Sequence, residues 1–369
     1  MSMIDYLLWR GDLRFEQSEF CEVDNLVLCY LTYVNLDGIA PEIGEGTMTV
    51  RELSDRFFLQ YSHKELEKDK SFIRLAPYVM KAMADTERFG DAMVRNYVNK
   101  IDLEKMLQFA AIEIILGDGT IFVAYRGTDD TIVGWKEDFY LSKGEILAEK
   151  EAVAYLNNIE SKKPLRIGGH SKGGNLAIYA AANCKPQIQG QILEIYNNDG
   201  PGFTKEFLES PGLFRIRSKI QSYIPESSVI GMLLEHVVEP TIIRSTQKGV
   251  MQHDGMSWEV RGNRFLYCEK LSNFSEIVDD VISKWLAEVE DEKRNQTIDD
   301  LFAVLEATQA KTLTELQEGG MKNVRIIIKE IESMDSESKE VLQELLKAFF
   351  HKVPSFLGIS NMLNKERKE

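Results

Sequence analysis

The sequence predicts an α/β fold with a wound, mostly parallel sheet, and three observations lead to this prediction. Apolar strand-like runs alternate with helical runs between residues 109 and 244. A Gly-x-Ser-x-Gly motif at 169–173 lies directly between a strand-like run and a helical run of small residues. Strand signals end near Cys268. Because strands separated by helices pair in parallel, the central region is expected to form one wound sheet.

The N-terminal region, from residue 1 to about residue 105, is predicted to be mainly helical. Apolar residues recur there at the spacing of a helix face, which predicts helices over 23–34, 49–61, 73–84 and 88–98. Acidic residues near Val23 suit the first turn of the first of these helices.

Strands are expected to begin near Phe109. Two β-rich runs, 109–116 and 120–125, flank an Asp-Gly turn, which predicts a hairpin. The pattern that follows predicts helices over 145–161 and 174–183 and strands over 165–168, 192–197, 220–224 and 238–244.

A helical C-terminal extension, 271–369, is predicted to follow a domain formed by residues 1–270. Three apolar stripes at helical spacing support it: Leu301, Val304 and Leu305; Val324, Ile327, Ile328 and Ile331; and Leu342, Leu345, Leu346 and Phe349. These stripes fit core packing, a cap over a site, or a surface that binds a partner.

Composition and charge exclude several classes of function. The 369 residues are 44% hydrophobic with a formal net charge of −15, which disfavours binding to nucleic acid through its phosphates. The four cysteines form no Cys-x-x-Cys pair, so free thiols are expected, and neither a metal nor an organic cofactor is predicted. The N-terminus carries no basic, apolar leader and no run is long enough to span a membrane, so we expect a soluble, cytoplasmic protein.

The Gly-x-Ser-x-Gly motif predicts a nucleophile elbow with Ser171 as the nucleophile. Such an elbow needs a strand, a sharp turn and a helix, and the motif lies in that context. The strained turn requires residues almost without side chains at minus two and plus two, which Gly169 and Gly173 provide. The N-terminus of the following helix favours negative charge that develops at the serine.

The general base is predicted to be His253. In hydrolases built on this elbow the chain order is serine, acid, histidine, and three histidines follow Ser171: His236, His253 and His351. His351 lies in the helical extension, and His236 follows an apolar stretch. His253 follows the last predicted strand, where a loop on a rigid sheet carries catalytic groups.

Two carboxylates are candidates for the acid that orients this histidine. Asp199 follows the strand after the nucleophile strand, in the run NNDGPGF, and we favour it. Glu226 follows the next strand and is the alternative. Asp254 is next to His253 in the chain and is expected to point away from it.

An oxyanion hole needs two backbone donors close to the serine. One is predicted to be the N–H of Lys172, the residue after the nucleophile. The second is predicted to be Thr128, which follows the strand at 120–125, because Gly127 before it permits a close approach.

These segments together resemble known lipases. FVAYRGTDDTIVGWKEDF, at 122–139, is similar to the oxyanion segment of class 3 lipases, and GGHSKGGNLAIYAA, at 168–181, is similar to their elbow, with Lys172 where they usually carry leucine. The N-terminal segment WRGDLRFEQSEFCEVDNLVLCYLTYV, at 9–34, with YNNDGPGF, SYIPESSVIGMLLEH and QHDGMSWEV, resembles a bacterial family of lipase-like proteins called Mbeg1-like, over residues 1 to about 270.

The resemblance implies an α/β-hydrolase fold with Ser171 as nucleophile, His253 as base and Thr128 in the oxyanion hole. It leaves both acids open, since class 3 lipases point to Glu226 and pancreatic-type lipases to Asp199.

We therefore expect a serine esterase or lipase-like hydrolase that acts on a small-molecule or lipid ester. An acyltransferase would share the same acyl-enzyme. The alternative of a different class is an inactive hydrolase scaffold whose C-terminal helices bind a partner.

Overall fold

A central eight-stranded sheet organises the protein, and its strands lie side by side in chain order. The computed structural model describes residues 1–69, 71, 73–102, 105, 107–128, 132, 134, 136, 141, 145–272, 291–310, 312–334 and 339. The strands are β1 (Met48–Thr49), β2 (Met93–Asp102), β3 (Leu107–Ile115), β4 (Ile121–Tyr125), β5 (Leu165–His170), β6 (Ile192–Asn198), β7 (Ile220–Pro225) and β8 (Thr241–Ile243). Strands β1 to β4 pair antiparallel, whereas β4 to β8 pair in parallel.

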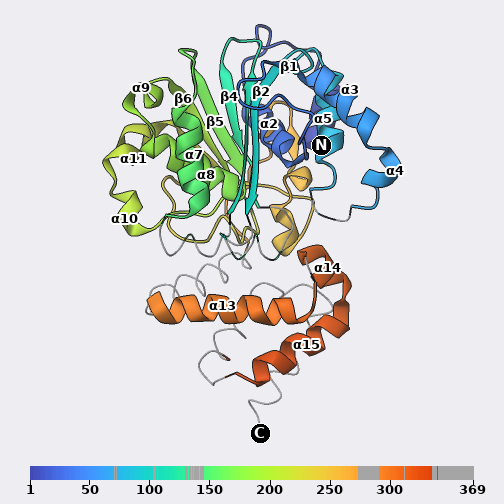
Figure 1. Cartoon of the computed structure of the whole chain (residues 1–369), viewed down its shortest axis with the longest axis vertical. Helices are drawn as coiled ribbons and strands as arrows, with labels where there is room; N and C mark the ends of the chain where they lie inside the picture. The colour runs from blue at the N-terminus through green and yellow to red at the C-terminus, as the bar shows by residue number, and fades with distance from the viewer. Residues whose placement is uncertain are drawn as a thin grey trace.

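One face of the sheet is covered by helices that connect its parallel strands (Figure 1). Because β4 to β8 advance across the sheet in one direction, right-handed connections place their helices on the same face. These helices are α7 (Leu147–Asn157), α8 (Lys172–Asn183), α9 (Pro186–Gln189), α10 (Lys205–Leu208) and α11 (Pro211–Ile216), the last followed by the 3₁₀ turn η3 (Arg217–Lys219).

The N-terminal segment covers the opposite face (Figure 1). Its helices are α1 (Met3–Arg10), α2 (Glu22–Tyr30), the 3₁₀ turn η1 (Leu31–Tyr33), α3 (Val50–Gln60), α4 (His63–Leu66) and α5 (Ala76–Ala84). Helix α2 packs directly on β4 and β5, the two strands that lead into the predicted site. The buried pair Asp24 and Arg88 holds this segment together, with Arg88 Nη2 2.6 Å from Asp24 Oδ2.

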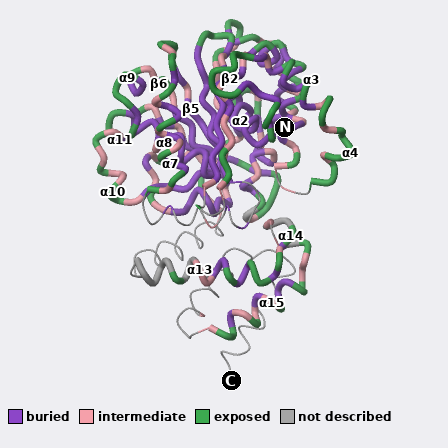
Figure 2. The backbone as a smooth tube through the Cα atoms, viewed as in Figure 1, coloured by how far each residue is buried: buried purple, intermediate pink, exposed green. Residues whose placement is uncertain are grey.

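The two faces of the sheet form two hydrophobic cores. On β4, Ile121, Val123 and Tyr125 pack with the helices α7 and α8, whereas Phe122 and Ala124 pack with the N-terminal segment. The strand is therefore buried on both sides, as a strand between two helical layers must be. Figure 2 shows the buried backbone concentrated in the sheet, with exposed residues on the outer helices and loops.

The loop that carries His253 crosses the end of the sheet. It is formed by two short 3₁₀ turns, η4 (Gly249–His253) and η5 (Gly255–Ser257), and a small hairpin of β9 (Val260–Arg261) and β10 (Arg264–Phe265).

The described part of the C-terminal region is helical, as predicted. It contains α13 (Asp291–Ala307), α14 (Leu313–Glu318) and α15 (Gly320–Glu332), drawn below the sheet in Figure 1. The first two predicted stripes bury most of their residues, and α13 packs on α15. The third stripe, from Leu342 to Phe349, lies outside the described residues. Lys136 Nζ, from the segment after β4, lies 3.0 Å from Asp299 Oδ1 of α13.

The predicted fold class is confirmed, and the strands and helices predicted between 109 and 244 are present with shifted ends. The predicted helix over 88–98 is wrong, because β2 begins at Met93. The register between β2 and β3 shifts between Arg95 and Val98, and Asn96 has φ 52°. This bulge buries Val94 and Tyr97, three residues apart, and so imitates the spacing of a helix. No helix in the described residues is long and apolar enough to cross a membrane.

Candidate active site

Ser171 lies on a sharp turn between β5 and α8. Its backbone has φ 58° and ψ −138°, a region that residues with a side chain rarely adopt. The turn is held by the Ser171 N–H, which donates to the carbonyl oxygen of Asn198 at the end of β6 over 2.9 Å. The side chain of Asn198 also donates to the carbonyl of Gly169 over 2.9 Å. The predicted strand, turn and helix are therefore all present around the serine.

Glycine is required where the backbones around this turn meet. A Cβ atom on Gly169 would lie 2.1 Å from the carbonyl carbon of Gly173, and one on Gly173 would lie 2.2 Å from the Tyr125 carbonyl oxygen. A Cβ atom on Gly127 would lie 2.7 Å from Ser171 Cβ. The loop after β4 therefore lies directly against the serine, where an oxyanion loop is needed.

His253 and Asp199 form a buried pair next to this turn. His253 Nδ1 lies 2.7 Å from Asp199 Oδ2, and the side chains are 6% and 0% exposed. The His253 ring also lies beside that of His170, the residue before Ser171, with 4.7 Å between ring centroids. Asp199 has φ 54°, which aspartate and asparagine tolerate better than most residues. The structure thus brings the favoured base and the favoured acid together, next to the residue that precedes the serine.

The other candidates are elsewhere. The Glu226 carboxylate lies near Cys268, with Oε2 3.9 Å from the Sγ atom. His236 lines a separate small cavity with Phe203 and Val238. His351 lies outside the described residues. Asp254 accepts a hydrogen bond from the Tyr30 hydroxyl over 2.9 Å.

Of the two predicted oxyanion donors, one follows the serine in the chain and the other lies in the loop packed against it. Lys172 is the first residue of α8, so its N–H is at the helix N-terminus. Thr128 follows Gly127 in the loop that contacts Ser171. Both residues are buried, and so is Ser171, which is 2% exposed.

Ser228, which no sequence motif indicates, contacts the acid. Its hydroxyl donates to Asp199 Oδ1 over 2.5 Å and accepts from the Gly231 N–H over 3.0 Å. The two oxygens of Asp199 therefore accept from two different donors. The only signal in the sequence for this contact is the pair of serines after β7, at 227–228, and it does not indicate a partner.

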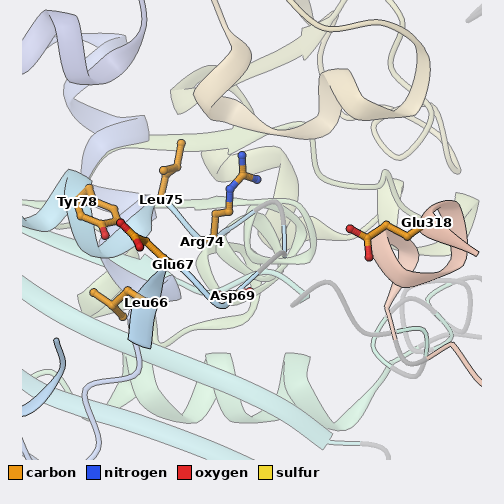
Figure 3. A pocket seen from close by; sticks show the side chains of 7 residues that line it. All are labelled: Leu66, Glu67, Asp69, Arg74, Leu75, Tyr78 and Glu318. Atoms are coloured by element: carbon orange, nitrogen blue, oxygen red, sulfur yellow. The ribbon is translucent and has the colours of Figure 1, made fainter. Parts of the chain in front are cut away.

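A pocket of about 460 Å³ lies at the edge of the N-terminal segment (Figure 3). It is lined by Leu66, Glu67, Asp69, Arg74, Leu75, Tyr78 and, from α14, Glu318. None of these lining residues is a candidate catalytic residue. Among the described residues, no cluster of His, Cys, Asp and Glu side chains is arranged to hold a metal ion.

A wound α/β sheet with a serine at a strand–helix elbow defines the α/β-hydrolase class, and the comparisons with known proteins add the family. The model of the Mbeg1-like family matches residues 83–303, so the chain belongs to the Mbeg1-like family. A solved structure, that of M37 lipase, is similar with a TM-score of 0.36 and 14% identity, over 91% of this chain and 93% of that chain. The search of curated proteins found no match.

Proposed function

We propose that the protein is a serine hydrolase that cleaves a carboxylic ester through an acyl-enzyme on Ser171. The observation that carries this proposal is the buried pair of His253 and Asp199, 2.7 Å apart, beside a serine with φ 58°. A serine on a strained strand–helix turn is the nucleophile position of elbow-type hydrolases, and a carboxylate-bound histidine is the base that such a serine needs.

In this mechanism Ser171 Oγ attacks the ester carbonyl while His253 Nε2 accepts the hydroxyl proton. The Asp199 carboxylate holds Nδ1–H and stabilises the imidazolium that forms. The N–H groups of Lys172 and Thr128 donate to the oxyanion, and one such donor is typically worth ~3–4 kcal/mol of transition-state stabilisation. The imidazolium then gives its proton to the departing alcohol, and the acyl group remains on Ser171. Water, deprotonated by His253, attacks the acyl-enzyme and releases the acid.

The proposed site is buried. Ser171 is 2% exposed and His253 is 5% exposed, so both residues have little contact with solvent. A closed site keeps bulk water away from the reacting atoms and strengthens the charge interactions there. We propose a small-molecule or lipid ester as substrate, with no cofactor step.

The test is labelling of the purified full-length protein with a fluorophosphonate, which phosphonylates an activated serine and releases fluoride. We expect labelling of the wild type and none of Ser171→Ala or His253→Ala. Ser257→Ala removes another buried serine, on the loop of His253, and should label like the wild type. Absence of labelling in folded wild type, with esters of several chain lengths also left intact, would contradict the proposal and favour the inactive scaffold. Product analysis with an added alcohol then separates hydrolysis from acyl transfer.

A further inference from the structure

A second histidine and a tyrosine connect the proposed base to the N-terminal segment. His170 Nε2 lies 2.7 Å from the main-chain carbonyl oxygen of His253. His170 Nδ1 lies 2.8 Å from the hydroxyl of Tyr33, in η1. All three residues are buried, so the chain from Tyr33 through His170 to His253 is shielded from water.

The direction of these hydrogen bonds follows from elementary chemistry. A carbonyl oxygen only accepts, so His170 Nε2 carries the proton and donates a hydrogen bond to the His253 carbonyl oxygen. Burial, with the nearby His253 as a smaller cause, holds the pKa of His170 well below its usual range, so the ring is neutral. Nδ1 then bears a lone pair, which accepts from the Tyr33 hydroxyl. The Tyr33 hydroxyl therefore stabilises the tautomer in which His170 binds the main chain of His253.

Tyr33 also lies where three parts of the site meet. A Cβ atom on Gly127 would lie 2.5 Å from its hydroxyl oxygen, so this hydroxyl is against the oxyanion loop as well as the elbow. Three residues earlier, the Tyr30 hydroxyl donates to Asp254 over 2.9 Å and accepts from the Met256 N–H over 3.2 Å. Tyr30 thus holds the chain just after His253, and Tyr33 reaches the His253 carbonyl through His170.

We propose that Tyr33 and His170 are positioning residues that orient His253 toward Asp199, an inference that rests on the proposed function. The carbonyl of His253 belongs to η4, a 3₁₀ turn of only 5 residues, which has little rigidity of its own. With its main chain held by His170, the imidazole keeps Nδ1 at 2.7 Å from Asp199. Neither Tyr33 nor His170 is assigned a direct contact with substrate.

The first test needs no substrate. In full-length protein labelled with ¹⁵N-histidine, the Nδ1–H of His253, hydrogen-bonded to Asp199, should give a strongly deshielded proton resonance that Asp199→Asn removes. We expect Tyr33→Phe and His170→Leu to broaden or abolish this resonance. Tyr155→Phe is the matched control, since it removes a buried hydroxyl that donates to the Asn96 carbonyl over 2.8 Å in the other core.

The second test follows fluorophosphonate labelling and ester hydrolysis. Loss of one buried hydrogen bond should lower the labelling rate of Tyr33→Phe roughly tenfold. It should lower kcat with KM unchanged, and Tyr155→Phe should retain the wild-type rate. His170→Gln offers an amide donor near the position of Nε2 and should exceed His170→Leu in rate.

The two tests separate the two proposals. An intact resonance and an unchanged labelling rate in both Tyr33→Phe and His170→Leu would overturn the positioning role. If the wild type shows the resonance but does not label, and both variants lose the resonance, the positioning role would be supported and the proposed hydrolase contradicted.

Discussion

Replacement of Asp199 by asparagine tests the proposed acid most directly. Asparagine keeps the size of the side chain and tolerates the φ of 54° at this position, so the backbone need not move. The change removes a negative charge whose Oδ2 atom lies 2.7 Å from His253 Nδ1. The amide also offers one acceptor, whereas His253 and Ser228 both donate to the carboxylate.

The expected loss can be worked from this geometry. Opposite unit charges with centres about 4 Å apart attract by ~4 kcal/mol at an effective dielectric constant of about 20. The attraction exists only once His253 is protonated in the transition state, so its loss raises the barrier. At about 1.4 kcal/mol per factor of ten, the reaction should slow roughly 10³-fold.

The assay is the second-order rate constant of fluorophosphonate labelling, with thermal unfolding as the check on folding. Glu226→Gln is the matched control, because its carboxylate is beside Cys268, and it should label within about threefold of wild type. The reasoning would be refuted if Asp199→Asn stayed within tenfold of the wild-type rate while Glu226→Gln lost activity.

Three further predictions concern the supports of the site. Gly127→Ala should reduce the rate of fluorophosphonate labelling at least ~100-fold, because the new Cβ would lie 2.7 Å from Ser171 Cβ and 2.3 Å from the His170 carbonyl oxygen. A wild-type labelling rate in this variant would contradict the close approach of the two loops. Arg88→Met leaves the Asp24 charge buried and should lower the free energy of unfolding by ~3–5 kcal/mol in urea denaturation, whereas a loss below ~1 kcal/mol would argue against a buried pair. Because the folded pKa of His170 is below its usual 6.5, the unfolded chain binds an extra proton below that pH. The contribution of His170 to the free energy of unfolding should therefore be fully present above pH 6.5 and fall by about 1.4 kcal/mol per pH unit as the pH drops toward the folded pKa. His170→Gln should remove this pH dependence when the free energy of unfolding is measured by urea denaturation at several pH values.

The spacing of apolar residues predicts a helix where the structure has strand β2, and the reason is physical. Period-two alternation identifies a strand only where the ladder is regular. In β2 the bulge between Arg95 and Val98 breaks this alternation, and Val94 and Tyr97 turn to the same core. Strands β4 to β7 have no register shift beyond one at the start of β5, and all of them were recognised.

Local sequence patterns were sufficient to predict the elbow, the wound sheet and the helical C-terminal region. Each depends on residues close together in the chain: glycines two positions from Ser171, or apolar residues at a fixed spacing. The tertiary structure alone decided which carboxylate faces His253, because Asp199 and Glu226 follow adjacent strands and only the path of the 249–257 loop separates them. It also revealed Tyr33 beside His170, 137 residues apart in the chain. Such a contact arises from the packing of the N-terminal layer on the sheet, which no local pattern encodes.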